Sequence, residues 1–251
     1  MEIILDVWEG SYDINELVLY LADVRGLIIR LNDMNGGHHM DENFLSQWAQ
    51  AQSFLRAPYF VYNPWVTGLV NYYWLIDHLP TSGVTRIFID VEVKYSGYSA
   101  EIYADQLEIF MNLIKAKYPL AVIYTGAWFL SVVAHWPKGS YWWARYPWIY
   151  YPAARENWTW EQLKAKIHAN PYAPDPLGQC PGIPDLWQLS GDRLILPGCA
   201  DRPMDVSIFN GDLPALEAWW GAKLPPPPGK TLEQRVQVLE QLVVAHGWTL
   251  P

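Results

Sequence analysis

Short apolar runs alternate with amphipathic stretches along the first half of the chain. The runs are rich in β-branched and aromatic residues and predict strands, whereas the stretches between them carry apolar positions at helical spacing. In the stretch 100–117, for example, Tyr103, Phe110 and Ile114 fall on one face of a helix. This alternation is typical of parallel strands joined by crossover helices. The predicted strands are 3–5, 26–31, 58–62, 86–92 and 121–124, and the predicted helices are 14–24, 41–54, 65–78 and 100–117.

The pattern changes after about position 135. Four short strands are predicted there, at 141–146, 148–151, 185–189 and 203–208, with a single helix at 159–167 between them. The second half therefore closes the sheet with strands and loops more than with helices. We expect an α/β fold in which the sheet closes into a barrel.

The C-terminal part differs in composition from the rest. A helix is predicted at 213–220, so we place the barrel domain at 1–222, a proline-rich linker at 223–230 and a C-terminal helix at 231–251. In that last helix Leu232, Val236, Leu239, Val243 and His246 form a heptad-like seam of about two heptads. Two interpretations stay open, a tail helix packed on its own barrel and a helix that joins copies of the chain into a homo-oligomer.

Charge excludes several classes of partner. The chain has 17 Lys and Arg against 26 Asp and Glu, a net charge of −9, whereas nucleic acids and anionic lipids are bound through clustered basic residues. The uncharged stretch 118–136 approaches the length of a membrane span, but Pro119, Gly126 and His135 are among the residues that interrupt it. The acidic start MEIILD does not resemble a secretory signal. We therefore expect neither a nucleic acid nor a membrane as partner.

Aromatic residues are unusually abundant, with 15 Trp, 16 Tyr and 7 Phe. One core needs fewer, so we expect some of these rings to line a surface or cleft, although packing in the core explains many of them. Aromatic rings beside carboxylates suit sugars, whose C–H groups stack on rings while their hydroxyls need acceptors.

Carboxylates stand at three predicted strand ends. Asp90 and Glu92 are two positions apart, which on a strand places both on one face, about 6.5 Å apart. Asp6 ends the first strand and Asp205 lies in the last, and the first and last strands of a closed barrel are neighbours. A close pair of carboxylates raises the pKa of one member, which then serves as a general acid, and glycoside cleavage needs such a pair.

The order of motifs resembles that of the glycoside hydrolase family 25 lysozymes. That family has an Asp-Val-Ser-like first strand, then Asp-x-Glu, Trp-x-Ala-x-Tyr, Trp-Gln and a closing Asp-x-Asn-like strand. Here the corresponding segments, spread over about 3–211, are Asp6-Val7-Trp8-Glu9-Gly10, Asp90-Val91-Glu92, Trp142-Trp143-Ala144-Arg145-Tyr146, Trp187-Gln188-Leu189 and Asp205-Val206-Ser207, and Tyr124-Thr125-Gly126 resembles the fifth strand of the family. The stretch 30–39 departs from the family's Thr-Glu-Gly-like continuation of the second strand, which bears on substrate preference.

The resemblance implies a TIM-like β/α barrel with a reduced helix complement and a short C-terminal helical tail. It also implies hydrolysis of the β-1,4 bond between N-acetylmuramic acid and N-acetylglucosamine in peptidoglycan. Glu92 would be the proton donor, and Asp90 would position the substrate's N-acetyl group or stabilise the oxocarbenium charge. Asp6 and Asp205 would flank the cleaved bond. Candidate walls of the sugar groove are Tyr62, with Tyr59 as its alternative in the other register, and Tyr124, Trp142 and Trp187.

The resemblance implies action on the bacterial cell wall. With no signal visible, we expect a protein released by a phage or prophage, or exported by another route. No cofactor and no metal are expected, because Cys180 and Cys199 match no zinc pattern. We expect those two cysteines to form a disulfide, and His38 and His39 to lie in a solvent-exposed loop.

Two alternative functions stay open. The altered second strand and the heptad-like tail also fit a non-catalytic glycan-binding or assembly module on the same barrel. A glycosidase for another amino-sugar polymer, such as chitin, would share every site residue and differ only in substrate.

Overall fold

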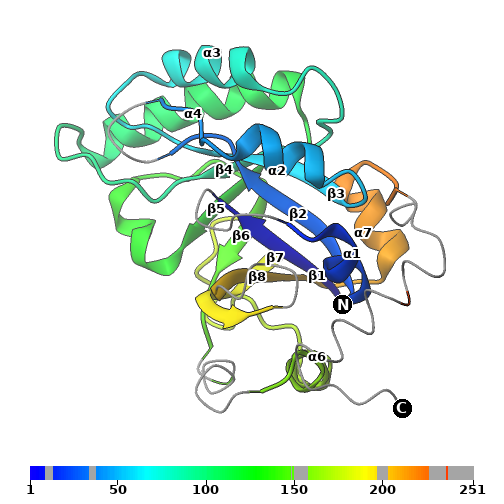
Figure 1. The fold of residues 1–251 in the computed structure, drawn as a ribbon. Helices are drawn as coiled ribbons and strands as arrows, with labels where there is room; N and C mark the ends of the chain where they lie inside the picture. Colours follow the sequence, from blue (N-terminus) through cyan, green and yellow to red (C-terminus); the bar gives the residue numbers. More distant parts are fainter. Residues whose placement is uncertain are drawn as a thin grey trace.

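The computed structural model shows a closed barrel of eight strands in chain order (Figure 1). It describes residues 1–8, 14–33, 38–147, 149, 158–196, 203–225 and 236. Neighbouring strands from β1 to β7 are parallel, whereas β8 runs antiparallel to both β7 and β1. The predicted TIM-like β/α barrel is confirmed. The strands are β1 (Glu2–Val7), β2 (Val24–Arg30), β3 (Leu55–Val61), β4 (Phe88–Asp90), β5 (Val122–Gly126), β6 (Ser140–Ala144), β7 (Ile183–Ile195) and β8 (Pro203–Phe209).

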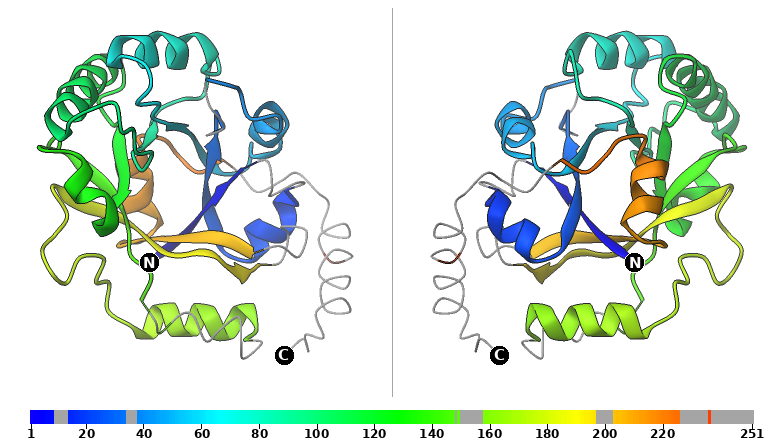
Figure 2. Two further views of the ribbon diagram at one scale, coloured as in Figure 1. Left: turned by 90° about the vertical axis from the view of Figure 1, so that its left-hand side faces the viewer. Right: turned by 90° about the vertical axis from the view of Figure 1, so that its right-hand side faces the viewer.

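Helices lie around the outside of the barrel, with α3 and α4 together on one side and α6 on the opposite side (Figure 2). Each of these three begins at a Ser or Thr whose hydroxyl accepts a backbone N–H of the first turn. The described helices are α1 (Glu16–Leu21), α2 (Phe44–Gln50), α3 (Gly68–His78), α4 (Ala100–Lys117), the 3₁₀ helix η2 (Ala127–Val132), α6 (Trp160–Ala169) and α7 (Leu213–Trp220). Within the described residues, no helix combines the length and the apolar character that crossing a membrane requires.

Side chains alternate between two cores along each strand. Residues of one parity point outward and pack under the helices, as Ile29 and Phe60 do, whereas residues of the other parity, such as Ile28 and Phe88, fill the barrel. This alternation fixes which polar residues of each strand enter the barrel.

Helix α7 closes the end of the barrel at which β1 begins (Figure 1). Because β8 is antiparallel, the chain leaves it at that end, and α7 directs the fully buried Trp220 into the inner core, 5.8 Å from the ring of Phe88. Gly26 of β2 permits this approach, since a Cβ there would lie 3.1 Å from the Trp220 ring. The opposite end, where the parallel strands finish, carries the candidate site.

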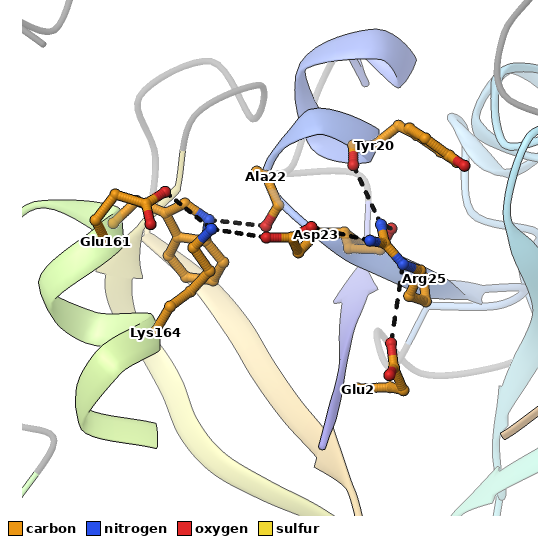
Figure 3. Close-up of polar contacts among 9 residues, drawn as sticks. Glu2, Tyr20, Ala22, Asp23, Arg25, Glu161 and Lys164 are labelled. Atoms are coloured by element: carbon orange, nitrogen blue, oxygen red, sulfur yellow. Dashed lines mark hydrogen bonds and ion pairs between the residues drawn. The ribbon is translucent and has the colours of Figure 1, made fainter. Parts of the chain in front are cut away.

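Successive ion pairs connect α6 to the turn before β2 (Figure 3). Lys164 on α6 lies 2.7 Å from the carboxylate of Asp23, which Arg25 also contacts at 2.9 Å. Arg25 reaches back to Glu2 on β1, at 3.8 Å. Since the Asp23 side chain is half exposed, these pairs set the position of α6 more than they stabilise the fold.

Several predicted boundaries are corrected. Strand β4 ends at Asp90, so Glu92 lies just beyond the strand, and the helix predicted from Asp41 begins at Phe44 with Asn43 as its N-cap. Asp41 instead accepts the backbone N–H of Asn43 and a hydrogen bond from the side chain of Arg30. Three predicted features lie outside the described residues: the strand at 148–151 except for residue 149, Cys199, and the helix at 231–251 except for residue 236. The disulfide and the oligomer therefore stay predictions.

Candidate active site

Four carboxylates gather at the end of the barrel where the parallel strands finish. Asp6 stands near the end of β1 and is the register partner of Asp205 near the start of β8. Asp90 is the last residue of β4, and Glu92 follows two positions later. Asp6 and Asp90 are buried, whereas Glu92 and Asp205 are partly exposed. The structure therefore brings together all four predicted acids.

Burial and mutual repulsion change the protonation of this group. Burial raises the pKa of Glu92 to about 7, and the negative charge of Asp205 adds to the increase. Burial also raises the pKa of Asp90, helped by the charges of Glu92 and Asp205 and opposed by the guanidinium of Arg30. A large fraction of Glu92 is therefore protonated near neutral pH and able to donate a proton.

Gln188 of β7 connects Asp6 to two tyrosines. Its amide Nε2 donates to Asp6 Oδ2 at 3.0 Å, and its Oε1 accepts from the hydroxyls of Tyr124 at 2.8 Å and Tyr146 at 2.6 Å. Because the amide donates to a carboxylate and accepts from two hydroxyls, its orientation is fixed. The sequence motif contained Gln188 and Tyr146, but sequence reasoning gave neither of them a role.

Arg30 is a partly buried cation at the same end of the barrel. Its Nε donates to Asp41 Oδ2 at 2.9 Å, and its guanidinium carbon lies 5.1 Å from the ring centroid of Trp8. The neighbouring residue Ile29 faces outward, so Arg30 faces inward and its charge acts on Asp90. A single cation at the end of an apolar strand was the sequence signal for this residue.

Two of the predicted aromatic residues face into the barrel. Tyr124 and Trp142 have ring centroids 4.4 Å apart, and both belong to the inner core. The indole Nε1 of Trp142 donates to Ser207 Oγ at 2.9 Å, which fixes the ring beneath the carboxylates. Trp142 is almost fully buried, so it supports Tyr124 from below.

The other two predicted wall residues point outward. Tyr62 is fully buried against the ring of Phe110 on α4, 5.4 Å away, and Trp187 donates its indole N–H to the carbonyl of Arg145. The structure does not bring either ring to the carboxylates. The inward positions are taken by Tyr59 and Gln188, because neighbouring residues of a strand point to opposite faces. The pKa of Tyr59 is raised by burial and by the charges of Asp6, Asp90 and Asp205.

The two adjacent histidines differ in environment. His39 is exposed as predicted, but His38 is half-buried, stacks on the ring of Trp74 at 4.9 Å and forms a 2.9 Å hydrogen bond with Asn71. The prediction of an exposed loop was therefore wrong for His38. Among the residues that the structure describes, no group of three or more His, Cys, Asp or Glu side chains could hold a metal ion.

Comparison with known proteins supports the fold. No protein-family model matches the chain, and no curated protein matches its sequence. The structure is similar to that of a family 25 glycosyl hydrolase from Bacillus anthracis, with a TM-score of 0.66 and 16% identity over 87% of this chain and 93% of the other. It is also similar to a bacterial lysozyme from Streptomyces coelicolor, with a TM-score of 0.65 and 18% identity over 87% and 96% of the two chains. A modular endolysin complexed with a peptidoglycan analogue matches with a TM-score of 0.55 and 17% identity over 84% of this chain and 54% of the other. The chain thus has the fold of the glycoside hydrolase family 25 lysozymes.

Proposed function

We propose that this protein is a lysozyme-type muramidase that hydrolyses the β-1,4 bond between N-acetylmuramic acid and N-acetylglucosamine in bacterial peptidoglycan. The observation that carries the proposal is the group of four buried or partly buried carboxylates at the end of the barrel where the parallel strands finish, in which the pKa of Glu92 is raised to about 7. Its fold is that of a glycosyl hydrolase and a lysozyme, and a further structural neighbour is an endolysin complexed with a peptidoglycan analogue.

Glu92 is the proposed general acid. Its protonated carboxyl donates a proton to the glycosidic oxygen while the bond from that oxygen to the anomeric carbon breaks, which leaves positive charge on the sugar ring. A water molecule then adds to the anomeric carbon and gives a proton back to the Glu92 carboxylate. One water is consumed, and one new reducing end is formed.

The other acids act on the charge that develops. Asp6 and Asp205 flank the reacting sugar, and their negative charge stabilises the oxocarbenium-like transition state. Asp90 lies beside Glu92 and stabilises the same charge or orients the substrate's N-acetyl group. The hydrogen bond from Gln188 holds Asp6 in place, because Gln188 is itself fixed by Tyr124 and Tyr146.

Peptidoglycan glycan strands are the proposed partner, and the bacterial cell wall is the proposed place of action. Among the structural neighbours are an endolysin and a spore cortex lytic enzyme. We propose that the protein reaches the wall by release from a phage or prophage host, or by another export route. Association of copies through 231–251 is part of the same proposal, and sedimentation of the chain with and without that segment tests it.

The test is the release of reducing ends from purified peptidoglycan, with mass spectrometry of the fragments. Wild type and Glu92→Gln are compared with Glu101→Gln, a matched control whose side chain is 74% exposed on α4. We expect fragments that end in reducing muramic acid from the wild type and from the control, and a rate at least about 100-fold lower from Glu92→Gln. Circular dichroism checks that all three proteins are folded.

Other results would favour the alternatives. Cleavage by Glu92→Gln at the wild-type rate would remove Glu92 as the acid. Release of reducing ends from chitin but not from peptidoglycan would indicate the other amino-sugar substrate. Binding to peptidoglycan without any new reducing ends would indicate a non-catalytic binding module.

A further inference from the structure

A hollow lies beside the carboxylates, at the ends of β5 and β6. It has a volume of about 330 Å³, within the range of small-molecule sites. Its floor is the end of β6 and the two residues that follow, Arg145 and Tyr146. One wall is the start of η2 with Trp128, and the other is the segment 175–179 with Leu177. None of these residues except Tyr146 takes part in the site described above.

The aromatic wall is rigid. The indole ring of Trp128 covers Gly126, where an added Cβ would lie only 2.3 Å from the ring, and its centroid is 5.9 Å from that of Tyr146. Even so, Trp128 remains 52% exposed. Trp128 does not stand alone, since it faces a hollow with further apolar lining residues, and concave sites lined by apolar and aromatic side chains are typical of ligand binding.

The opposite wall is also held in place, by hydrogen bonds. Both carboxylate oxygens of Asp175 are occupied, one by the backbone N–H of Gln179 and one by that of Cys180, each at 2.8 Å. The guanidinium of Arg145 donates to the carbonyl of Ala173 at 2.7 Å, which ties the end of β6 to this segment. Leu177 is held by this arrangement with 76% of its surface exposed. The hollow therefore has two fixed apolar walls.

Tyr146 joins the hollow to the carboxylates. Its ring lines the hollow, while its hydroxyl donates to Gln188, which in turn donates to Asp6. Tyr146 thus contacts both the hollow and the hydrogen-bond network that holds Asp6. A substrate with a branch near the bond to be cleaved can place its main chain at the carboxylates and the branch in the hollow.

The lining indicates the chemistry of that branch. Most of it is apolar, including Ala127, Trp128, Pro176 and Leu177, and Arg145 is the one cation among the described residues that line it. Sugar hydroxyls need several hydrogen-bonding partners, but the carboxylate of Asp175 and the hydroxyl of Tyr146 are already engaged, which leaves the guanidinium of Arg145 and the side-chain amide of Gln179 as the main polar groups of the lining. Small apolar groups followed by a carboxylate match this lining better than a sugar ring does.

We propose that this hollow is a subsite for the peptide stem of peptidoglycan, with small apolar stem residues against Trp128 and Leu177 and a stem carboxylate bound by Arg145. The inference rests on the proposed muramidase function, since the stem is attached to the muramic acid unit beside the bond that is cleaved. It gives the enzyme a preference for stem-bearing glycan over bare glycan.

The test compares two soluble substrates, glycan strands that carry stems and the same strands after an amidase has removed the stems. We expect the wild-type kcat/KM to be at least about tenfold higher on the stem-bearing strands, equivalent to about 1.4 kcal/mol of binding. Leu177→Asp replaces an apolar wall of the hollow with a negative charge, which opposes both the apolar stem residues and the stem carboxylate, and should bring the ratio of the two kcat/KM values toward one. Arg145→Gln should change the ratio in the same direction.

Leu45→Asp is the matched control, because Leu45 is also a largely exposed leucine, 64% exposed on α2. It should keep the wild-type ratio. A wild-type ratio near one, or a Leu177→Asp ratio equal to that of the wild type, would overturn the subsite while the muramidase function stands. Failure of the wild type to cleave either substrate would overturn the muramidase function and the subsite together.

Discussion

Asp6 on β1 and Asp205 on β8 are direct partners in an antiparallel strand pair, so their side chains point to the same side of the sheet. Like charges placed opposite each other destabilise a sheet. The repulsion lies at the end of the barrel where the parallel strands finish, and there the charge of Asp205 also raises the pKa of Glu92. A residue of β8, the strand that closes the barrel, therefore helps to keep Glu92, which follows β4, protonated.

The first prediction concerns Asp205. Asp205→Asn removes a negative charge that raises the pKa of Glu92, so that pKa should fall from its value of about 7. Because the protonated form of Glu92 is the acid, the alkaline limb of kcat/KM against pH should move to lower pH. The pH profiles of wild type and variant on peptidoglycan measure this, and an unchanged alkaline limb would contradict the coupling.

The second prediction concerns stability. The pKa of Glu92 rises from 4.5 to about 7 on folding, so the folded protein holds this proton more tightly than the unfolded chain does. The stability that depends on the protonated carboxyl is fully present below pH 4.5 and is lost as the pH increases through 7. Glu92→Gln cannot ionise and should be more stable than the wild type at pH 8, by on the order of 1–3 kcal/mol. At pH 4.5 the two should differ little.

Urea denaturation at both pH values measures this difference. Glu101→Gln, at an exposed position on α4, serves as the control for the same substitution outside the site. If Glu92→Gln were no more stable than the wild type at pH 8, burial would not raise the pKa of Glu92.

The third prediction concerns the amide at the centre of the site. Gln188→Leu removes the donor to Asp6 and the acceptor for the hydroxyls of Tyr124 and Tyr146. We expect a loss of about 1–3 kcal/mol in the free energy of unfolding, because buried polar groups lose their partners. Tyr146→Phe removes only one of these hydrogen bonds and should cost less. Equal stability of Gln188→Leu and wild type in urea would count against the network.

The fourth prediction concerns the ion pair between Arg30 and Asp41. Arg30→Met removes the counter-charge of Asp41, whose side chain is fully buried, and should cost about 3–5 kcal/mol. The double variant Arg30→Met/Asp41→Asn should recover part of this loss, because no buried charge is then left at Asp41. Thermal or urea unfolding of the four proteins of this cycle gives the coupling, and additive losses would show that the ion pair contributes nothing.

Local sequence patterns predicted most of the helices and strands, and they predicted that the four acids lie together at one end of the barrel. Helices α4 and α7 were predicted to the residue, since their amphipathic periodicity, and for α7 the Asp212 cap, are local features. Asp6, Asp90 and Asp205 were recognised because a charged residue inside or at the end of an apolar strand is conspicuous in one dimension. The boundaries of β4 and α2 were less accurate, because strand pairing and the Arg30–Asp41 pair determine them.

By itself, the sequence determined the order of strands and helices, the placement of acids at strand ends and the barrel that follows from them. Only the tertiary structure decided that β8 is antiparallel, that Tyr59 enters the barrel while Tyr62 points outward, and that Arg145 lines a hollow beside the carboxylates. The raised pKa of Glu92 was likewise decided there. The physical reason is that periodicity is a property of neighbouring residues, whereas strand register, burial and the distance between charges depend on segments that only the closed barrel brings together.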